Sequence, residues 1–248
     1  MPYNAKTNWR NNDIVTPSDL NRIEQGIAES ASPADDLILF VEPGGSDETG
    51  TGTSEKPFRT IQKAIDSFPT SNNFSKLCVI KMPEGDYPGF TLSAAKKIEI
   101  STQGTILITG DIVVNAGSIT FVDESDTSVN LIGGRVLIGG GEFTSMVMLA
   151  VTTEGQVGQI TAPGIECSAN GHFGVHADTV VTNHDVAISC FHGYVNLKRL
   201  MTDKTPTGIM CECGIVQLGD DVIQATTKFV TKNGGRIYVG AQTNMPNY

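Results

Sequence analysis

Short segments of alternating apolar and polar residues recur in this sequence at intervals of 21 to 23 positions. Gly193, Gly214 and Gly235 lie 21 positions apart, and each falls at or next to the start of such a segment, as in GYVNL and GIVQL. Self-similarity at a period of about 20 to 50 residues is typical of solenoids, in which each repeat buries its apolar face against its neighbours. The repeat therefore predicts a stack of similar coils.

Three cysteines sharpen this prediction. Cys167, Cys190 and Cys213 are spaced by 23 and 23 positions, in the motifs IEC, ISC and CEC. Alternation along a strand points one set of side chains inward, so parallel stacking would place these three cysteines above one another, about 4.8 Å apart. CEC together with Cys190 also suggests a zinc or thiol site, but the regular spacing favours a buried cysteine column in the core.

The same pattern begins earlier in the chain. Segments 97–100, 105–108, 111–122 and 129–139 again have the order strand, glycine-containing turn, strand, and GGRVLIG at 133–139 returns as GGRIYVG at 234–240. Abundant glycine (27 residues) with only 6% aromatic residues suits tight turns and a core of small or β-branched side chains. We therefore expect an all-β, single-chain parallel β-helix of about seven or eight coils between residues 77 and 240.

A short helix precedes these coils. In TGTSEKPFRTIQKAIDSFP (51–69) the apolar residues follow the helical period over 57–68, with Pro57 at the expected start and Pro69 after the end. The open end of a stack of strands exposes unpaired backbone, which natural proteins cover. We expect the helix 57–68 to cap the N-terminal end of the β-helix.

PFRTIQKAIDSFP, followed by VIKMPEGDY (79–87), resembles the start of the right-handed β-helix proteins of the pectate-lyase and pectin-esterase superfamily. The matching positions are Thr60–Ile65 and then Pro83, Gly85 and Tyr87, within residues 38–90. The resemblance implies a right-handed β-helix domain over 38–248, with coils of about 21 to 23 residues. It implies little about chemistry, because this fold carries many functions.

Residues 1–30 differ in character from the rest and are separated from it by a linker at 31–37. Thr16 is a suitable N-cap for a helix in which Leu20, Ile23 and Ile27 form one narrow apolar stripe. The stripe either packs on the chain's own β-helix or mediates self-association, as a coiled-coil seam does.

TNWRNNDIVTPSDLNRIEQGI (7–27) resembles the N-terminal segment of tail and baseplate structural proteins from phages of Gram-positive bacteria. In those proteins a W-x-x-x-D-x-V-T-x-x-D-L-N-R-I-E stretch precedes a receptor-binding or fibre domain. The resemblance implies that residues 1–30 attach the chain to other tail or baseplate proteins, with Trp9 and the apolar stripe as assembly residues. It also implies a virion location.

Charge and hydropathy bear on partners and compartment. The formal net charge of −10 argues against nucleic acid or an anionic membrane as partner. The N-terminus has no apolar signal-peptide core, and the run LILFV (37–41) is too short to span a membrane. We therefore expect synthesis in the host cytoplasm without a signal peptide, and the odd number of cysteines is not typical of a disulfide framework.

The sequence predicts no catalytic, metal or cofactor residues. The strings QDT and DFIFG of the esterase branch are absent, and His172 and His176 would lie about 13 Å apart on one strand, too far for one ion. The remaining histidines are His184 and His192. The carboxylates that could serve a lyase or hydrolase are scattered: Asp178, Asp185, Asp203, Asp220 and Asp221.

The candidate glycan-binding residues are Tyr194 and Tyr238, which we expect to point outward, together with Asp220 and Asp221, which we expect in a solvated turn. The favoured function is a homotrimeric tail or baseplate protein that binds host cell-wall polysaccharide. The alternatives are a virion-associated polysaccharide lyase or hydrolase, and a structural adaptor or spacer. A carboxylate pair about 5 to 10 Å apart would favour the enzyme.

Overall fold

The computed structural model describes residues 15–21, 23, 37–69, 77–123, 127–152 and 162–240. The chain divides into two compact units, residues 1–36 and 37–248. In the first unit residues 17–21 and 23 are helical. Thr16 is the N-cap: its Oγ1 accepts a hydrogen bond from the Asp19 backbone N–H (3.2 Å), and the Asp19 carboxylate accepts one from the Thr16 N–H (3.1 Å).

The apolar stripe of this helix is partly visible. Leu20 and Ile23 are 52% and 37% exposed, so within the described part of their unit nothing buries them. Ile27 and Trp9 lie outside the described residues, and the role of all four in assembly stays a prediction.

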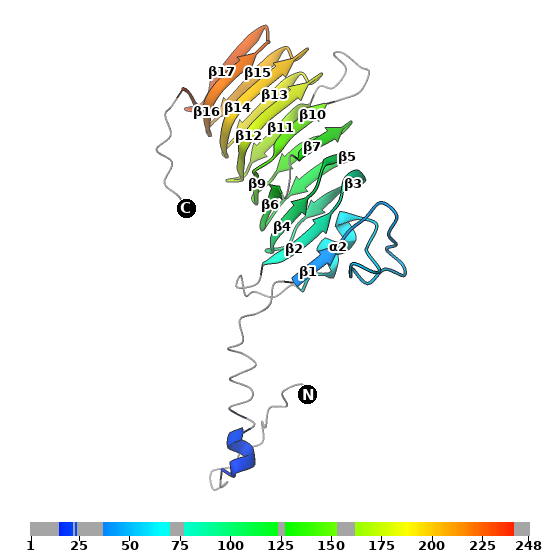
Figure 1. Cartoon of the computed structure of the whole chain (residues 1–248). Coiled ribbons are helices and arrows are strands. Elements are labelled where there is room, and N and C mark those ends of the chain that lie inside the picture. Colours follow the sequence, from blue (N-terminus) through cyan, green and yellow to red (C-terminus); the bar gives the residue numbers. More distant parts are fainter. Residues whose placement is uncertain are drawn as a thin grey trace. The chain divides into compact units, whose positions relative to one another are not determined.

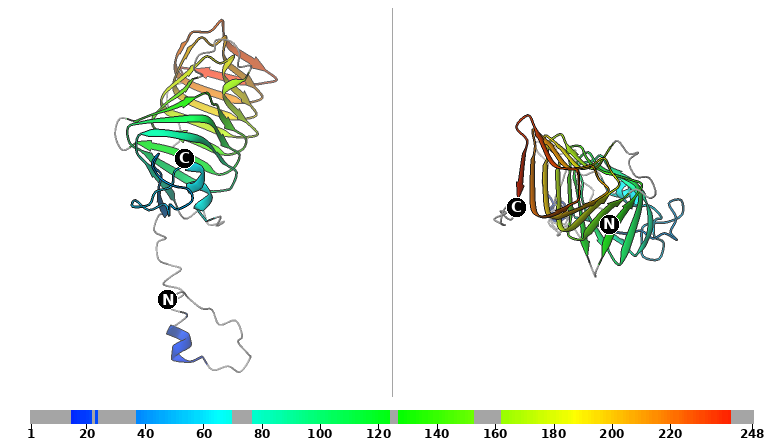
Figure 2. Two further views of the ribbon diagram at one scale, coloured as in Figure 1. Left: turned by 90° about the vertical axis from the view of Figure 1, so that its right-hand side faces the viewer. Right: turned by 90° about the horizontal axis from the view of Figure 1, so that it is seen from above.

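The second unit is a parallel β-solenoid, as the repeat predicts. Its strands stack coil upon coil in Figure 1, and the view from above in Figure 2 looks down the stack. Every pairing between its strands is parallel within the described residues, and each coil contributes one rung to each of three sheets. We call these sheets A, B and C in the order in which the chain visits them.

Sheet A comprises whole strands and the first halves of three long ones: β1 (Leu37–Phe40), β2 (Cys78–Met82), β4 (Lys97–Thr102), β6 (Ser118–Asp123), β9 (Glu142–Ser145), β18 (Arg236–Val239), and the starts of β12 (His172–Thr182), β14 (Tyr194–Asp203) and β16 (Ile215–Ile223). Sheet B comprises β7 (Ser128–Ile132), β10 (Met148–Thr152), the ends of β12, β14 and β16, and the starts of β3 (Gly85–Leu92) and β5 (Thr105–Val114). Sheet C comprises β8 (Val136–Ile138), β11 (Pro163–Ser168), β13 (Val186–Phe191), β15 (Thr207–Glu212), β17 (Thr227–Lys232) and the ends of β3 and β5.

Three strands per coil correct the two-strand unit expected from the sequence. The sequence pattern misses the corner between sheets A and B, because this corner lies inside a single long strand. Strand β12 turns from sheet A to sheet B at a register shift between Val175 and Asp178, and no glycine or proline lies between these two residues. Because the strand does not stop there, the sequence pattern merges two strands into one.

Inward columns of apolar side chains form the core. In sheet A one column reads Ile98, Ile119, Phe143, Phe173, Val195 and Val216, all 0% exposed. The rings of Phe143 and Phe173 stack at a centroid distance of 5.2 Å. Stacking like on like gives each side chain a neighbour of similar shape above and below, which favours close packing.

A cysteine column does run through sheet C, but its third member is Cys211. Cys167 is in register with Cys190, and Cys190 with Cys211. The prediction of Cys213 was wrong because this coil has 21 residues, which places Cys213 in the next corner, exposed and with a left-handed φ of 55°. A side chain at Gly193 would place its Cβ 2.7 Å from the Cys167 Sγ, so only glycine allows this close approach.

The similar heptapeptides at 133–139 and 234–240 are not structurally equivalent. Val136 of the first pairs with Ile112 and Ile165 in sheet C. Ile237 of the second pairs with Val216 in sheet A. A glycine followed by an alternating strand occurs in more than one sheet, so the similarity of the two segments does not identify the sheet or the register of either strand.

A helix covers the N-terminal end, as expected, but it is shorter than 57–68. Helix α2 spans Ile61–Ser67, and Thr60 is its N-cap. The helix starts later than predicted because Phe58 still pairs as extended chain with Val41. The Gln62 side chain donates to the Thr91 carbonyl (3.2 Å) and accepts from the Thr91 N–H (2.8 Å), so it substitutes for a strand below the first rung of sheet C.

Candidate functional site

The outer surface of sheet A carries a polar column along the solenoid. Its polar members lie in register at outward positions, between inward-facing apolar neighbours: Glu99, Thr120, Thr144, Asn196, Gln217 and Tyr238. Gly174 occupies the rung between Thr144 and Asn196, and the first two rungs of the column carry Ile38 and Val79. The polar side chains can donate to and accept from ligand hydroxyl groups. We call this surface the polar face.

The two predicted tyrosines both lie on the polar face. The Tyr194 hydroxyl is 2.6 Å from Gln217 Oε1, and Gln217 is in register with Tyr238. Tyr238 lies two rungs beyond Tyr194, which is about 10 Å along the stack. Tyr238 is 41% exposed. The structure therefore brings Tyr194 and Tyr238 to one surface, with Gln217 between them.

Two further residues extend this surface and were not predicted as binding residues. The His172 ring lies 4.8 Å from the Tyr194 ring, and its Nδ1 is 3.6 Å from the Glu142 carboxylate. The side chains of His172 and Glu142 are both about half exposed, so this contact contributes little to stability. Only the pairing of successive coils identifies these residues, since Glu142 pairs with His172 and His172 pairs with Tyr194.

Asp220 and Asp221 do not join the tyrosines. They lie inside strand β16 on sheet B, which corrects the solvated turn expected for them. Asp220 is in register with Arg199, which makes a two-pronged contact with the Asp178 carboxylate. Hydrogen bonding to Arg199 holds the pKa of Asp178 below its usual value, so that carboxyl stays ionised. Asp221 is 3.5 Å from Lys228 Nζ.

A cavity of about 300 Å³ opens where the first rungs of sheet A meet the corner to sheet B. It is lined by Phe40, Glu42, Lys81, Met82, Pro83, Ser101 and Gln103. A second cavity, of about 380 Å³, lies in the glycine-rich loop before helix α2 and is lined by residues 44–46, 49, 50 and 55–57. The first combines one aromatic ring with polar groups, a composition that suits a small polar ligand.

The sequence predicts no metal site among the histidines and cysteines. Within the described ranges no three His, Cys, Asp or Glu residues gather closely enough to hold a metal ion. Burial raises the pKa of the Cys167 thiol to about 11 and that of Cys190 to about 12, so both stay protonated at neutral pH.

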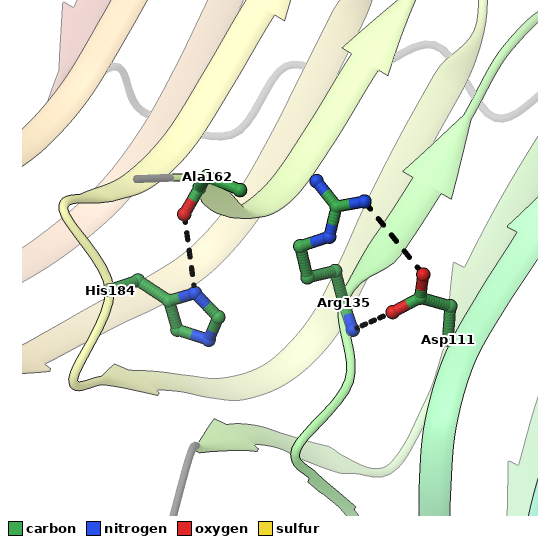
Figure 3. A network of polar contacts seen from close by, with 4 residues as sticks. All are labelled: Asp111, Arg135, Ala162 and His184. Atoms are coloured by element: carbon green, nitrogen blue, oxygen red, sulfur yellow. Dashed lines mark hydrogen bonds and ion pairs between the residues drawn. The ribbon is translucent and has the colours of Figure 1, made fainter. Parts of the chain in front are cut away.

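His184 lies apart from the polar face, at the corner between sheets B and C. It is 1% exposed, its Nδ1 is 3.4 Å from the Ala162 carbonyl, and its Nε2 has no hydrogen-bond partner among the described residues. Figure 3 shows this ring beside Arg135, whose backbone N–H donates to Asp111 (2.8 Å). Burial lowers the pKa of His184, so the ring is neutral at pH 7.

Fold and surface together define a parallel β-solenoid with a polar, aromatic-containing outer face. Comparison of the chain with protein-family models, curated proteins and solved structures gives no match. Among the described residues, no helix combines the length and apolar composition needed to cross a bilayer.

Proposed function

We propose that this chain is a receptor-binding component of a phage tail or baseplate, and that the polar face recognises a glycan of the host cell wall. The observation that carries the proposal is the cluster of Tyr194, Gln217 and Tyr238 on one outward surface, continued by His172 and Glu142. Aromatic rings bind the apolar faces of sugar rings, while amide, hydroxyl and carboxylate groups bind their hydroxyls.

The extended shape of this surface suits a polymeric ligand. Successive rungs repeat about every 4.8 Å, so the polar face offers similar groups at regular intervals along the stack. Individual contacts of this kind are weak, and several copies of the chain would raise the overall affinity through multivalency. The resemblance of residues 7–27 to tail and baseplate proteins supports attachment to the virion through residues 1–30.

The test is sedimentation of the purified full-length chain with cell walls of Gram-positive bacteria. We expect the wild-type protein to bind walls of a susceptible strain, and a Tyr194→Ala, Tyr238→Ala double variant to bind at least tenfold more weakly, or about 1.4 kcal/mol. Phe191→Ala is the matched control, because Phe191 is an exposed aromatic residue (46%) on sheet C and should leave binding unchanged.

Each alternative function has its own outcome in this assay. Release of new reducing ends or unsaturated sugars from the walls would indicate a polysaccharide-degrading enzyme. Absence of wall binding by wild-type protein from every strain, with capture of a tail or baseplate protein instead, would indicate an adaptor. Equal binding by the tyrosine double variant and the wild type would refute the polar face as the binding surface.

A further inference from the structure

Strands β1 and β2 form the first two rungs of sheet A (Figure 1), and the cavity of about 300 Å³ lies where these rungs separate. Beyond Val41 the chain leaves β2, because the Glu42 N–H donates to the Phe58 carbonyl (2.9 Å). Pro83, which follows β2, has no N–H with which to continue the pairing. The two rungs therefore diverge at the corner between sheets A and B. We call the resulting space the corner cavity.

The corner cavity is a recess in the outer surface of sheet A. Its side walls are two parallel columns on three successive rungs: Phe40, Lys81 and Ser101 in register at outward positions, then Glu42, Pro83 and Gln103 two positions later. Ser101 and the neighbouring Val79 occupy outward positions but are only 5% and 7% exposed. Thr120 and Thr144 on the polar face are more exposed. A ligand in the corner cavity is therefore shielded from water more than one on the polar face.

Hydrogen bonds hold the walls of the corner cavity in place. The buried Tyr87 donates its hydroxyl to the Pro83 carbonyl (2.9 Å). Burial and the nearby Glu42 carboxylate raise the pKa of Tyr87, so this hydroxyl keeps its proton. The Gln103 N–H donates to the Met82 carbonyl (3.2 Å). A site with a fixed shape loses little conformational entropy when a ligand binds.

The size and chemistry of the corner cavity define a class of ligand. About 300 Å³ is the lower end of the range for small-molecule sites, so the cavity accommodates one ring and not a chain. Glu42 and Lys81 have opposite formal charges, so the lining has no net charge and favours a neutral ligand. The Phe40 ring offers an apolar surface, and the polar groups of the lining can hydrogen bond several hydroxyls. A neutral sugar presents this combination of an apolar ring face and several hydroxyls.

The corner cavity also adjoins the polar face. The column that begins with Phe40 and Lys81 lies two residues along the strands from the column that contains Ile38, Val79 and Glu99. Four rung intervals separate the rung of Glu99 from the rung of Tyr194, which is about 19 Å along the stack. A glycan lying along the polar face therefore passes the cavity.

We propose that the corner cavity binds one neutral sugar unit of the glycan, with the Phe40 ring against the sugar ring and the polar lining groups bonded to its hydroxyls. This inference rests on the proposed function and assigns a specificity subsite to it. The cavity selects the identity of one sugar, while the polar face contributes repeated and less selective contacts along the polymer.

The experiment is a ligand-observed NMR titration of the purified full-length protein with single sugars. The neutral probes are glucose, galactose, rhamnose and N-acetylglucosamine, and the charged probes are glucuronic acid and glucosamine. Phe40→Ala removes the aromatic surface, and Gln103→Ala removes an amide at an exposed position where truncation leaves the core intact. Val122→Ala is the matched control, because Val122 is in register with Ser101 on the next rung and does not line the cavity. Circular dichroism melts establish that each variant is folded.

We expect at least one neutral sugar to bind the wild-type protein with a millimolar Kd and to bind more tightly than both charged sugars. Phe40→Ala should weaken this binding by about tenfold and Gln103→Ala by about threefold, whereas Val122→Ala should leave it unchanged. The inference is overturned if no neutral sugar binds, if a charged sugar binds best, if both cavity variants bind as the wild type does, or if the control loses binding as well.

Wall binding is scored separately, so that failure of the inference and failure of the proposed function can be distinguished. A wild type that sediments with cell walls but binds no neutral sugar refutes the corner cavity as a subsite and leaves the proposed function standing. A wild type that binds a neutral sugar in the cavity but sediments with no walls refutes the proposed function instead.

Discussion

Lys96 is the residue through which the stability of the N-terminal cap can be measured most directly. Its side chain is buried, and its ammonium group donates to the carbonyls of Ile65 (2.7 Å) and Phe68 (2.8 Å), at the C-terminal end of helix α2. The last carbonyls of a helix have no partner within the helix and carry partial negative charge. Lys96 therefore ties helix α2 to the first coil.

We expect Lys96→Met to lower the free energy of unfolding by about 2 to 3 kcal/mol. Each hydrogen bond to a charged group contributes about 1.5 to 3 kcal/mol, and two are lost. The variant also avoids the desolvation of a buried ammonium, which offsets part of this loss. For a unit of this size, 1 kcal/mol corresponds to about 2 to 4 °C in Tm, so we expect a decrease of roughly 5 to 10 °C.

The assay is a thermal melt followed by circular dichroism, with hydrogen exchange to locate the effect. Lys97→Met is the control, since Lys97 is the adjacent lysine but is exposed. Exchange should rise first in helix α2 and at Thr91, whose backbone pairs with Gln62 of the helix. A Lys96→Met melt within about 1 °C of wild type, or an equal loss in the control, would refute the reasoning.

Three further predictions concern the solenoid. Burial depresses the pKa of His184 in the folded state, so protonation favours the unfolded chain. The free energy of unfolding should therefore be full above pH 6.5 and should fall below that pH by up to about 1.4 kcal/mol per pH unit. Urea titrations at pH 7 and 5 should show that His184→Asn removes this fall and that His192→Asn, at an exposed histidine, does not. Cys213→Asn should raise Tm by about 1 to 4 °C, because asparagine tolerates the left-handed φ of 55° and already occupies such a position at residue 233; an unchanged or lower Tm would contradict this. Gln62→Ala should make the chain aggregate more readily, as scattering at constant protein concentration would detect, because it leaves the Thr91 backbone edge unpaired; aggregation equal to wild type would argue against that role.

The sequence predicts the interior of this protein better than its surface. Inward positions are mostly apolar and repeat from coil to coil, so the periodicity indicates a parallel solenoid and a buried cysteine column. The period itself varies, however: Phe143 and Phe173 are 30 positions apart, whereas Val195 and Val216 are 21 apart. A fixed spacing of 23 therefore selects Cys213 where the register selects Cys211. Nothing in the local sequence says which sheet a strand joins, as the two GGR segments show.

The same limitation applies to the candidate site. Tyr194 and Tyr238 are 44 positions apart, and only the register places them on one surface while Asp220 and Asp221 fall on another. The sequence alone indicates at most a metal-ligand role for His172, because its neighbour on the next coil, Tyr194, cannot be identified without the strand pairing.

A solenoid of this kind separates the residues that determine its fold from those that determine its contacts. The inward columns consist mainly of apolar side chains, as in the column through Phe143 and Phe173, whereas the outward columns can vary with little effect on folding. The outward column of sheet A, for example, carries Glu99, Thr120, Thr144, Asn196 and Gln217, none of which the packing of the interior requires. Substitutions at those positions should therefore change what the polar face can bind and leave the solenoid folded.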